Sequence, residues 1–231
     1  MEFAAAIIAS YLLGSIPAAH IAGKSKGIDL RKHGSGNLGA TNVIRVLGAK
    51  VGLLVFAFDM AKGALPVALF PRLMPPTAWP GDPVVAGILC GVAAIVGHVR
   101  PIYLKFGRGG KGVATSAGVF LALAPIQTLL TLLIFVVVLL VSGYVSLGSL
   151  ISAVMLPVLL LLTVGPRSPL FAISVVVAAF VFWTHRANIT RLRNGEEHRF
   201  GKRGVPAKQP VATFAIGAVI LAAVLVALRF G

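Results

Sequence analysis

Long apolar segments alternate with short polar segments along the chain. The apolar segments cover approximately 3–22, 43–71, 84–98, 113–124, 126–142, 144–164, 168–184 and 210–228. A helix needs about 20 predominantly apolar residues to cross the hydrocarbon core of a bilayer, and several of these segments reach or approach that length. The pattern therefore predicts an all-α fold, in a polytopic integral membrane protein with several transmembrane helices.

Basic residues are concentrated in three of the polar segments. Of the 21 Lys and Arg residues, four lie in 24–32, four in 100–111 and seven in 186–208. Loops rich in Lys and Arg stay on the cytoplasmic side of a membrane. We therefore expect all three basic segments on that side, and the Pro-rich segment 71–83 outside.

The placement of these loops limits the number of crossings. With all three basic segments on one side, residues 113–164 must cross an odd number of times. Three short spans divided near Pro125 and Gly143 satisfy this requirement, and one long span within 113–142 is the alternative. Three spans give seven in total up to residue 184, with the N-terminus outside.

The chain contains no internal repeat or linker, so residues 1–200 are expected to form one membrane-embedded domain. Residues 201–231 are expected to add a basic loop and an extra C-terminal transmembrane segment, 210–228. The N-terminus lacks the basic region and cleavage site of a signal peptide, so the first apolar segment is expected to be retained.

Composition supports the membrane assignment and narrows the chemistry. Hydrophobic residues make up 58% of the chain and charged residues 12%, against about 25% charged in soluble domains. The formal net charge of +15 indicates an anionic membrane surface or an anionic substrate. Nucleic acid is not expected, because the basic loops lack interleaved aromatic residues. The lone Cys90 excludes an intrachain disulfide, and the six acidic residues are too scattered to predict a metal or cofactor site.

Two glycine-rich loops carry the features of an anion site. They are "HGSGNLGATN" (33–42) and "FGRGGKGVAT" (106–115), and each precedes an apolar helix. Such turns expose backbone N–H groups, and the following helix N-terminus adds partial positive charge. The hydrogen-bonding side chains of the first loop are Ser35, Asn37, Thr41 and Asn42, and the second loop places Lys111 as a point charge at the start of an apolar segment. The alternative is that these glycines only turn the chain at the membrane surface.

A third polar segment, "HRANITRLRNGEE" (185–197), places His185, Asn188 and Arg191 at i, i+3 and i+6. A continuing helix would bring them close to one face. His185 is a candidate general base, phosphate donor or capping residue. No histidine is followed by Asp at the fifth position after it, so the usual base motif of acyltransferases is absent.

Segment 58–63, "FDMAKG", places Asp59 and Lys62 at i, i+3 inside an apolar stretch. Charged side chains at membrane depth usually pair with one another. We therefore expect an intramembrane ion pair that braces the fold.

Three long segments resemble the signature motifs of the bacterial acyl-phosphate:glycerol-3-phosphate acyltransferases of the PlsY type. They are "YLLGSIPAAHIAGKSKGIDLRKHGSGNLGATNVIRVLG", "GHVRPIYLKFGRGGKGVAT" and "HRANITRLRNGEE". The resemblance implies a seven-span inner-membrane enzyme whose active site faces the cytoplasm. It also implies transfer of an acyl group from acyl phosphate to the 1-hydroxyl of sn-glycerol 3-phosphate, which yields lysophosphatidic acid and phosphate. It favours three spans in 113–164.

The resemblance also implies roles for individual residues. The residues that match the glycerol-3-phosphate site are Ser35, Arg45, Lys111, His185 and Asn188, of which Ser35, Lys111 and His185 are the catalytic candidates. The residues that match the acyl-phosphate site are Gly36, Asn37, Thr41, Gly109, Gly110, Lys111, Gly112 and Ser149. The proton of the hydroxyl goes either to His185 or to a substrate phosphate. The expected partners are the two substrates, the lipid bilayer and the soluble enzyme that makes acyl phosphate.

Two other functions are weighed against this one. A CDP-alcohol phosphotransferase needs several metal-binding Asp residues, which the chain lacks. A membrane transporter of a phosphorylated metabolite also needs basic residues near the membrane, and the absence of an internal repeat counts against it.

Overall fold

The computed structural model describes residues 1–73, 75, 77, 79 and 81–200, and within these residues the secondary structure is entirely helical. The α-helices are α1 (Glu2–Ser15), α2 (Ala18–Lys24), α3 (Ala40–Leu47), α4 (Ala49–Leu73), α5 (Pro83–Val99), α6 (Val113–Leu123), α7 (Pro125–Ser142), α8 (Val145–Val164), α9 (Pro169–Thr184) and α10 (Arg186–Arg193). Two short 3₁₀ turns, η1 (Leu30–Lys32) and η3 (Ile102–Leu104), lie in the loops. The predicted all-α class is confirmed.

Among the described residues, five helical stretches are long and apolar enough to cross a bilayer: Glu2–Lys24, Ala49–Leu73, Pro83–Leu104, Pro125–Ser142 and Val145–Val164. A sixth is formed if α9 and α10, which meet at 60°, are taken together. Because α10 carries three Arg residues, we place the end of that span at Thr184. Residues 113–164 form three helices divided at Pro125 and Gly143, as expected. However, α6 has only 11 residues and is not among the candidate spans, so the expected count of seven spans is not confirmed. The expected span 210–228 lies outside the described residues.

The structure divides the apolar segment 43–71, which was expected to form one span. Gly48 adopts φ of 92°, a conformation that glycine reaches at little cost, and it separates α3 from α4. The spanning helix therefore begins at Ala49, and Arg45 on α3 belongs to a separate short helix. A similar break at Ile16 and Pro17 separates α1 from α2.

Small residues bring α4 and α6 into close backbone contact. A Cβ atom on Gly63 would overlap the carbonyl oxygen of Thr115, and one on Gly118 would overlap that of Met60. Helices in membranes pack through such small residues, because lipid supplies no hydrophobic force between them. This contact fixes the start of α6, and with it the second glycine loop, against α4.

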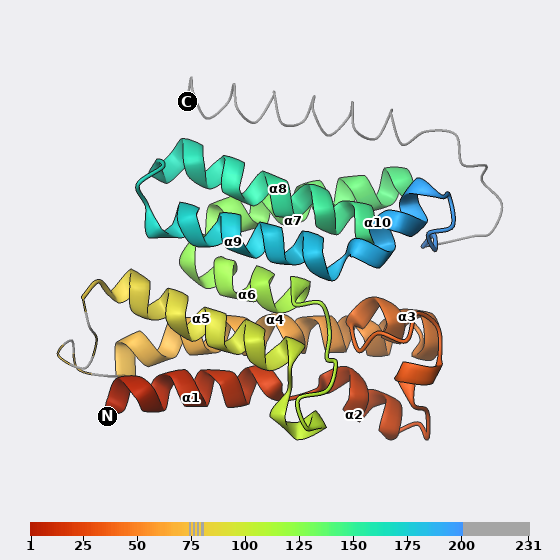
Figure 1. Ribbon diagram of the computed structural model, residues 1–231, viewed down its shortest axis with the longest axis horizontal. Helices are drawn as coiled ribbons and strands as arrows, with labels where there is room; N and C mark the ends of the chain where they lie inside the picture. The colour runs from red at the N-terminus through yellow and green to blue at the C-terminus, as the bar shows by residue number, and fades with distance from the viewer. Residues whose placement is uncertain (74, 76, 78, 80, 201–231) are drawn as a thin grey trace.

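Helices α3 and α10 and the loop between α2 and α3 lie toward one end of the bundle, while the end of α4, the start of α5 and the α8–α9 connection lie at the other (Figure 1). The described parts of the first and third basic segments therefore lie at the opposite end of the bundle from the end of α4 and the start of α5. Large apolar side chains such as Leu54, Ile126 and Leu140 are exposed on the sides of the bundle, as expected for a surface in contact with lipid.

Candidate functional site

The first glycine loop is built around the side chain of Asn42. Its Oδ1 accepts a hydrogen bond of 2.8 Å from the Ser35 N–H, and its Nδ2 donates to the carbonyl oxygens of Leu30 at 3.2 Å and His33 at 3.0 Å. Asn42 is 1% exposed. A buried amide with all these bonds satisfied holds the loop in one conformation. The sequence predicted Asn42 as a hydrogen-bonding side chain for an anion, whereas here its amide is used to hold the loop itself.

Two glycines of this loop, Gly34 and Gly36, have φ of 61° and 69°. A Cβ atom on Gly34 would overlap Asn42 Oδ1, and one on Gly36 would lie 3.0 Å from the carbonyl oxygen of Arg31. These positions require glycine both for conformation and for space.

The loop presents polar side chains that the protein itself leaves unused. Ser35 and Arg45 are exposed, and Asn37 and Thr41 are half-buried. None of these four side chains forms a hydrogen bond or an ion pair with any other residue that the structure describes. They are therefore free to bind a ligand.

The second loop ends in Gly112, which has φ of 84° and caps the N-terminus of α6. Lys111 precedes it, and the Lys111 ammonium donates a hydrogen bond to Asn188 Oδ1 on α10. The Lys111 carbonyl accepts a bond of 3.4 Å from the Thr184 hydroxyl at the end of α9. The second and third motifs are thereby brought together, as the predicted site required.

Lys111 lies among charges of both signs. Burial lowers the pKa of its ammonium group to about 8, the Glu197 carboxylate opposes that shift, and the positive charges of Arg191 and Arg45 add to it. The contribution of Arg45 shows that α3, which follows the first loop, lies within electrostatic range of the second loop. A cluster of cationic groups with one carboxylate attracts an anion such as a phosphate.

Glu197 organises the third motif, and sequence reasoning did not single it out. Its carboxylate accepts hydrogen bonds from Asn188 at 2.7 Å, Arg191 at 2.7 Å and Ser146 at 3.0 Å. Burial raises the pKa of Glu197, but these bonds outweigh it and keep the pKa below its usual value. The sequence offered one signal for this role: Glu197 is an acidic residue at the end of a motif that is otherwise rich in basic residues.

His185 is buried, with 3% exposure, at the junction of α9 and α10. Its Nδ1 lies 2.8 Å from the Val181 carbonyl oxygen. A carbonyl only accepts, so Nδ1 carries the proton and Nε2 of the neutral ring has a free lone pair. Burial, together with the charge of Lys111, lowers the pKa of His185 to about 4. The ring is therefore neutral at pH 7 and presents a hydrogen-bond acceptor.

Ser149 is the least supported of the predicted site residues. It is buried on α8, and its hydroxyl donates 2.9 Å to the carbonyl of Val145 in the same helix. The serine of α8 that joins the third motif is Ser146, through Glu197. Ser149 stays a prediction.

The expected ion pair between Asp59 and Lys62 is confirmed, with 2.7 Å between Nζ and Oδ1 and both side chains 3% exposed. Sequence reasoning missed a third member. His98 on α5 places its Nδ1 3.6 Å from the same carboxylate oxygen.

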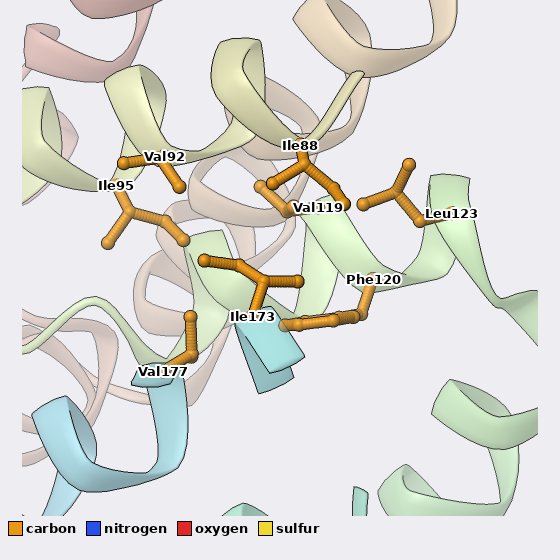
Figure 2. Close-up of a pocket in the computed structure, with 8 residues that line it drawn as sticks. All are labelled: Ile88, Val92, Ile95, Val119, Phe120, Leu123, Ile173 and Val177. Carbon is orange, nitrogen blue, oxygen red and sulfur yellow. The ribbon is translucent and has the colours of Figure 1, made fainter. Parts of the chain in front are cut away.

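An apolar pocket lies between α5, α6 and α9 (Figure 2). It is lined by Ile88, Val92, Ile95, Val119, Phe120, Leu123, Ile173 and Val177. In this conformation the side chains leave no room for a water molecule. Ile95 also lies beside Gly112, where a Cβ atom would be 3.5 Å from the Ile95 side chain. The pocket therefore adjoins the end of the second glycine loop.

Comparison with known proteins gives a consistent result. A family profile described as glycerol-3-phosphate acyltransferase matches residues 4–195. The glycerol-3-phosphate acyltransferase of Geotalea daltonii is 45% identical over 194 residues, which cover 84% of this chain and 95% of that protein. The enzyme of the same name from Trichlorobacter lovleyi is 46% identical over 198 residues, covering 84% and 95%.

Two crystal structures share the fold. Both are of PlsY, described as an integral membrane glycerol 3-phosphate acyltransferase. The glycerol 3-phosphate form has a TM-score of 0.79 and 37% identity, and the lysophosphatidic acid form has 0.76 and 36%. Each comparison covers 87% of this chain and 96% of the other.

Proposed function

The chain belongs to the glycerol-3-phosphate acyltransferase family, and from this premise we propose that it transfers a fatty acyl group from acyl phosphate to the 1-hydroxyl of sn-glycerol 3-phosphate. The products are lysophosphatidic acid and inorganic phosphate. The observation that carries the proposal is the bond between Lys111 and Asn188, which joins the second glycine loop to the third motif. Together with the nearby Arg45, it gives a cationic site suited to phosphates.

For glycerol 3-phosphate, we assign the phosphate to Arg45 and Lys111 and the glycerol hydroxyls to Ser35, His185 and Asn188. Three observations support this assignment. Ser35 and Arg45 are exposed and unused, Arg45 lies within electrostatic range of Lys111, and Asn188 is bonded to Lys111. Arg and Lys charges placed close together bind a dianionic phosphate more strongly than either alone.

For acyl phosphate, we assign the head group to the backbone of the two glycine loops. Gly36, Asn37 and Thr41 lie on the first, and the second contributes its consecutive residues Gly109, Gly110, Lys111 and Gly112. Backbone N–H groups at such turns and at a helix N-terminus bind phosphate oxygens. The hydroxyl of Ser149 would have to leave its bond to Val145 to take part.

The reaction then needs little beyond positioning. The glycerol hydroxyl oxygen attacks the acyl carbonyl carbon, the bond from that carbon to the phosphate oxygen breaks, and phosphate leaves. Preorganised N–H groups and cations stabilise the negative charge that develops. With its pKa lowered to about 4, His185 is a weak base. We therefore assign Nε2 of His185 to accepting a hydrogen bond from the hydroxyl, and the proton to the departing phosphate.

The acyl chain is assigned to the apolar pocket between α5, α6 and α9 (Figure 2). Its position beside Gly112 supports the assignment, because a chain whose head group lies at the loop would enter the pocket at Ile95. Each CH₂ group buried there contributes about 0.8 kcal/mol. Since the pocket is closed in this conformation, its side chains would move apart when the chain enters.

We place the enzyme in the bacterial inner membrane with its site on the cytoplasmic side. The concentration of Lys and Arg in the three loops of the site supports this orientation. Residues 1–200 would form the catalytic domain and 201–231 an addition to it. The soluble enzyme that makes acyl phosphate would deliver its product at the same end of the bundle.

The test uses the purified full-length protein in detergent, with acyl phosphate of 16 carbons and glycerol 3-phosphate. We expect lysophosphatidic acid and phosphate in equal amounts. Acyl-CoA of the same chain length should give no comparable turnover, because the described chain has no soluble domain to hold a nucleotide. Turnover from acyl-CoA with release of CoA would overturn the donor assignment. Uptake of glycerol 3-phosphate into sealed vesicles without acylation would favour the transporter.

A further inference from the structure

A buried ionic cluster lies directly beneath the second glycine loop. Asp59 and Lys62 on α4 form its ion pair, and Lys62 Nζ also donates 2.8 Å to the carbonyl oxygen of Ile16, at the break between α1 and α2. His98, near the end of α5 and 6% exposed, turns Nδ1 toward the Asp59 carboxylate at 3.6 Å. The Asp59 carboxylate therefore joins α4 to α5, and Lys62 links the pair to the α1–α2 break.

The other edge of the His98 ring faces the loop itself. A Cβ atom on Gly110 would overlap His98 Nε2 and would lie 2.7 Å from Cε1 of the ring. The same atom would lie 3.1 Å from the carbonyl oxygen of Leu38 in the first loop. Gly110 is therefore held between the imidazole and the first loop.

The neighbouring Gly109 is held as closely. Its N–H donates 3.0 Å to the carbonyl of Val99, and a Cβ atom on it would overlap the carbonyl of His98. A cavity of about 10 Å³ joins the parts, with walls formed by Leu38, Asp59, Lys62, His98, Gly109 and Gly110. The ion pair, the imidazole and both glycine loops thus border one small cavity.

A role in stability alone is a weak explanation for this cluster. Two charges with 3% exposure carry a desolvation cost that their attraction often fails to offset, and apolar residues of similar shape frequently replace such pairs without loss of stability. An apolar pair would pack α4 as well. It would not orient an imidazole ring against Gly110.

We propose that Asp59, Lys62 and His98 are positioning residues for the second glycine loop. The carboxylate fixes the orientation of the His98 ring, and the ring sets the path of Gly109 and Gly110. Because the Gly109 N–H is bonded to Val99, that path sets where the Gly110 N–H meets the donor phosphate. Lys62 neutralises the carboxylate and anchors it to the α1–α2 break. This inference rests on the proposed function, because it assigns the cluster to the acyl-phosphate site.

The decisive variant is the double substitution Asp59→Leu with Lys62→Met, which puts apolar side chains of similar shape at both positions and removes both charges. We expect a folded protein with near-normal Tm, because no unpaired charge is left. We expect kcat/KM for acyl phosphate to fall by about tenfold or more, since small misplacements of binding groups are costly. The KM for glycerol 3-phosphate should stay within about twofold of wild type.

Amide hydrogen exchange provides a readout that needs no substrate. In the double variant, exchange in 107–112 should become faster, while exchange in 145–164 should not change. His98→Phe, which keeps a ring but loses both nitrogens, should give the same local change and the same kinetic defect. The control is Gln127→Leu, which removes a 2.9 Å bond to Thr163 far from the loops and should leave kinetics and loop exchange unchanged.

The alternatives give different results. Wild-type kinetics and wild-type loop exchange in both the double variant and His98→Phe would reduce the cluster to a packing brace and overturn the proposal. Should the double variant fail to fold, His98→Phe alone decides between the two. Failure of the proposed function appears separately, as a wild-type protein that does not use acyl phosphate, whereas the exchange experiment still reports on the loop.

Discussion

The ammonium group of Lys111 donates a hydrogen bond to Oδ1 of Asn188, which lies 77 residues further along the chain. The other end of the Asn188 amide donates to Glu197 at 2.7 Å, and Glu197 in turn accepts from Arg191. Asn188 is thus oriented from both sides, with its oxygen toward Lys111. Because an amide fixed in this way holds the ammonium in place, the charge of Lys111 is positioned before a substrate binds.

Lys111→Ala should reduce kcat/KM by at least about a hundredfold, the loss usually seen when a group that stabilises developing charge is removed. The fold should remain, since Lys111 lies in a loop and its main partner is a polar side chain. Lys111→Arg should recover only part of the activity, because a planar guanidinium does not replace a compact ammonium. Lysophosphatidic acid formation and Tm, measured on the same preparations, test this. Near-wild-type kcat/KM in the Ala variant would remove Lys111 from the site.

The pH dependence of kcat/KM should show a fall above pH 8. Burial lowers the pKa of Lys111 to about 8, so the free enzyme loses this positive charge as the pH rises through that value and binds phosphate groups less well. The activity of Lys111→Arg should lack this fall, because arginine does not titrate below about pH 12. Initial rates at low substrate between pH 6 and pH 10 separate the two. If kcat/KM falls with the same midpoint in both proteins, the titrating group is not Lys111.

Glu197→Gln should lower activity through the orientation of its neighbours. Asn188 and Ser146 share Oε1 of the carboxylate, while Arg191 bonds Oε2. The Gln amide has one acceptor oxygen and an NH₂ group in place of the second, so it cannot keep all three bonds. We expect kcat/KM to fall by about tenfold, equivalent to about 1.4 kcal/mol, together with a lower Tm. Glu196→Gln, at the exposed neighbouring position, is the control and should behave as wild type.

The same carboxylate gives a prediction for stability. Hydrogen bonds keep the pKa of Glu197 below its model-peptide value of 4.5, against the effect of burial. Its contribution to stability is therefore complete above about pH 4.5 and disappears as the pH falls through the lower pKa of the folded state. Tm measured from pH 7 down to pH 3 should fall more for wild type than for Glu197→Gln. Parallel curves would contradict the role of this carboxylate.

Much of the helical architecture could be predicted because it depends on local sequence. Pro125 and Gly143 mark the ends of α7 as expected, since one starts a helix readily and the other adopts φ of 75°. The pair Asp59 and Lys62 was predictable because its members lie three residues apart on one helix. The break at Gly48 was not, because a glycine within an apolar run is compatible with a continuous helix.

The parts of the site that escaped prediction depend on tertiary contacts. Ser146 and Glu197 are 51 residues apart, and His98 reaches Asp59 from another helix. No spacing rule in a single sequence links such residues. By contrast, the glycine loops were visible because the chemistry of a phosphate site requires several glycines and a cation within a short segment.

Removal of residues 201–231 should leave catalysis intact, because the family profile ends at residue 195. Truncation after Phe200 keeps the 2.7 Å bond from the Phe200 N–H to the carbonyl of Gly143. We expect kcat and both KM values within about twofold of the full-length protein. The assay is turnover per folded molecule in detergent. Loss of turnover from a well-folded truncated protein would make the C-terminal segment part of the catalytic unit.

His185→Gln separates the two routes for the proton. Burial and the charge of Lys111 lower the pKa of His185 to about 4, so the neutral ring holds Nε2 as an acceptor throughout the range from pH 5.5 to pH 9. The Gln variant keeps a side-chain oxygen that accepts a hydrogen bond but cannot take a proton.

If a substrate phosphate receives the proton, His185→Gln should retain measurable activity and His185→Ala should retain far less. The shape of the pH profile between pH 5.5 and pH 7 should be the same in wild type and His185→Gln. If His185 is the general base, Gln and Ala should be equally inactive, and wild type should lose activity as the pH falls toward the ring's pKa of about 4. Initial rates for the three proteins from about pH 4 to pH 7, at saturating and at low glycerol 3-phosphate, therefore decide between the base and the hydrogen-bond acceptor.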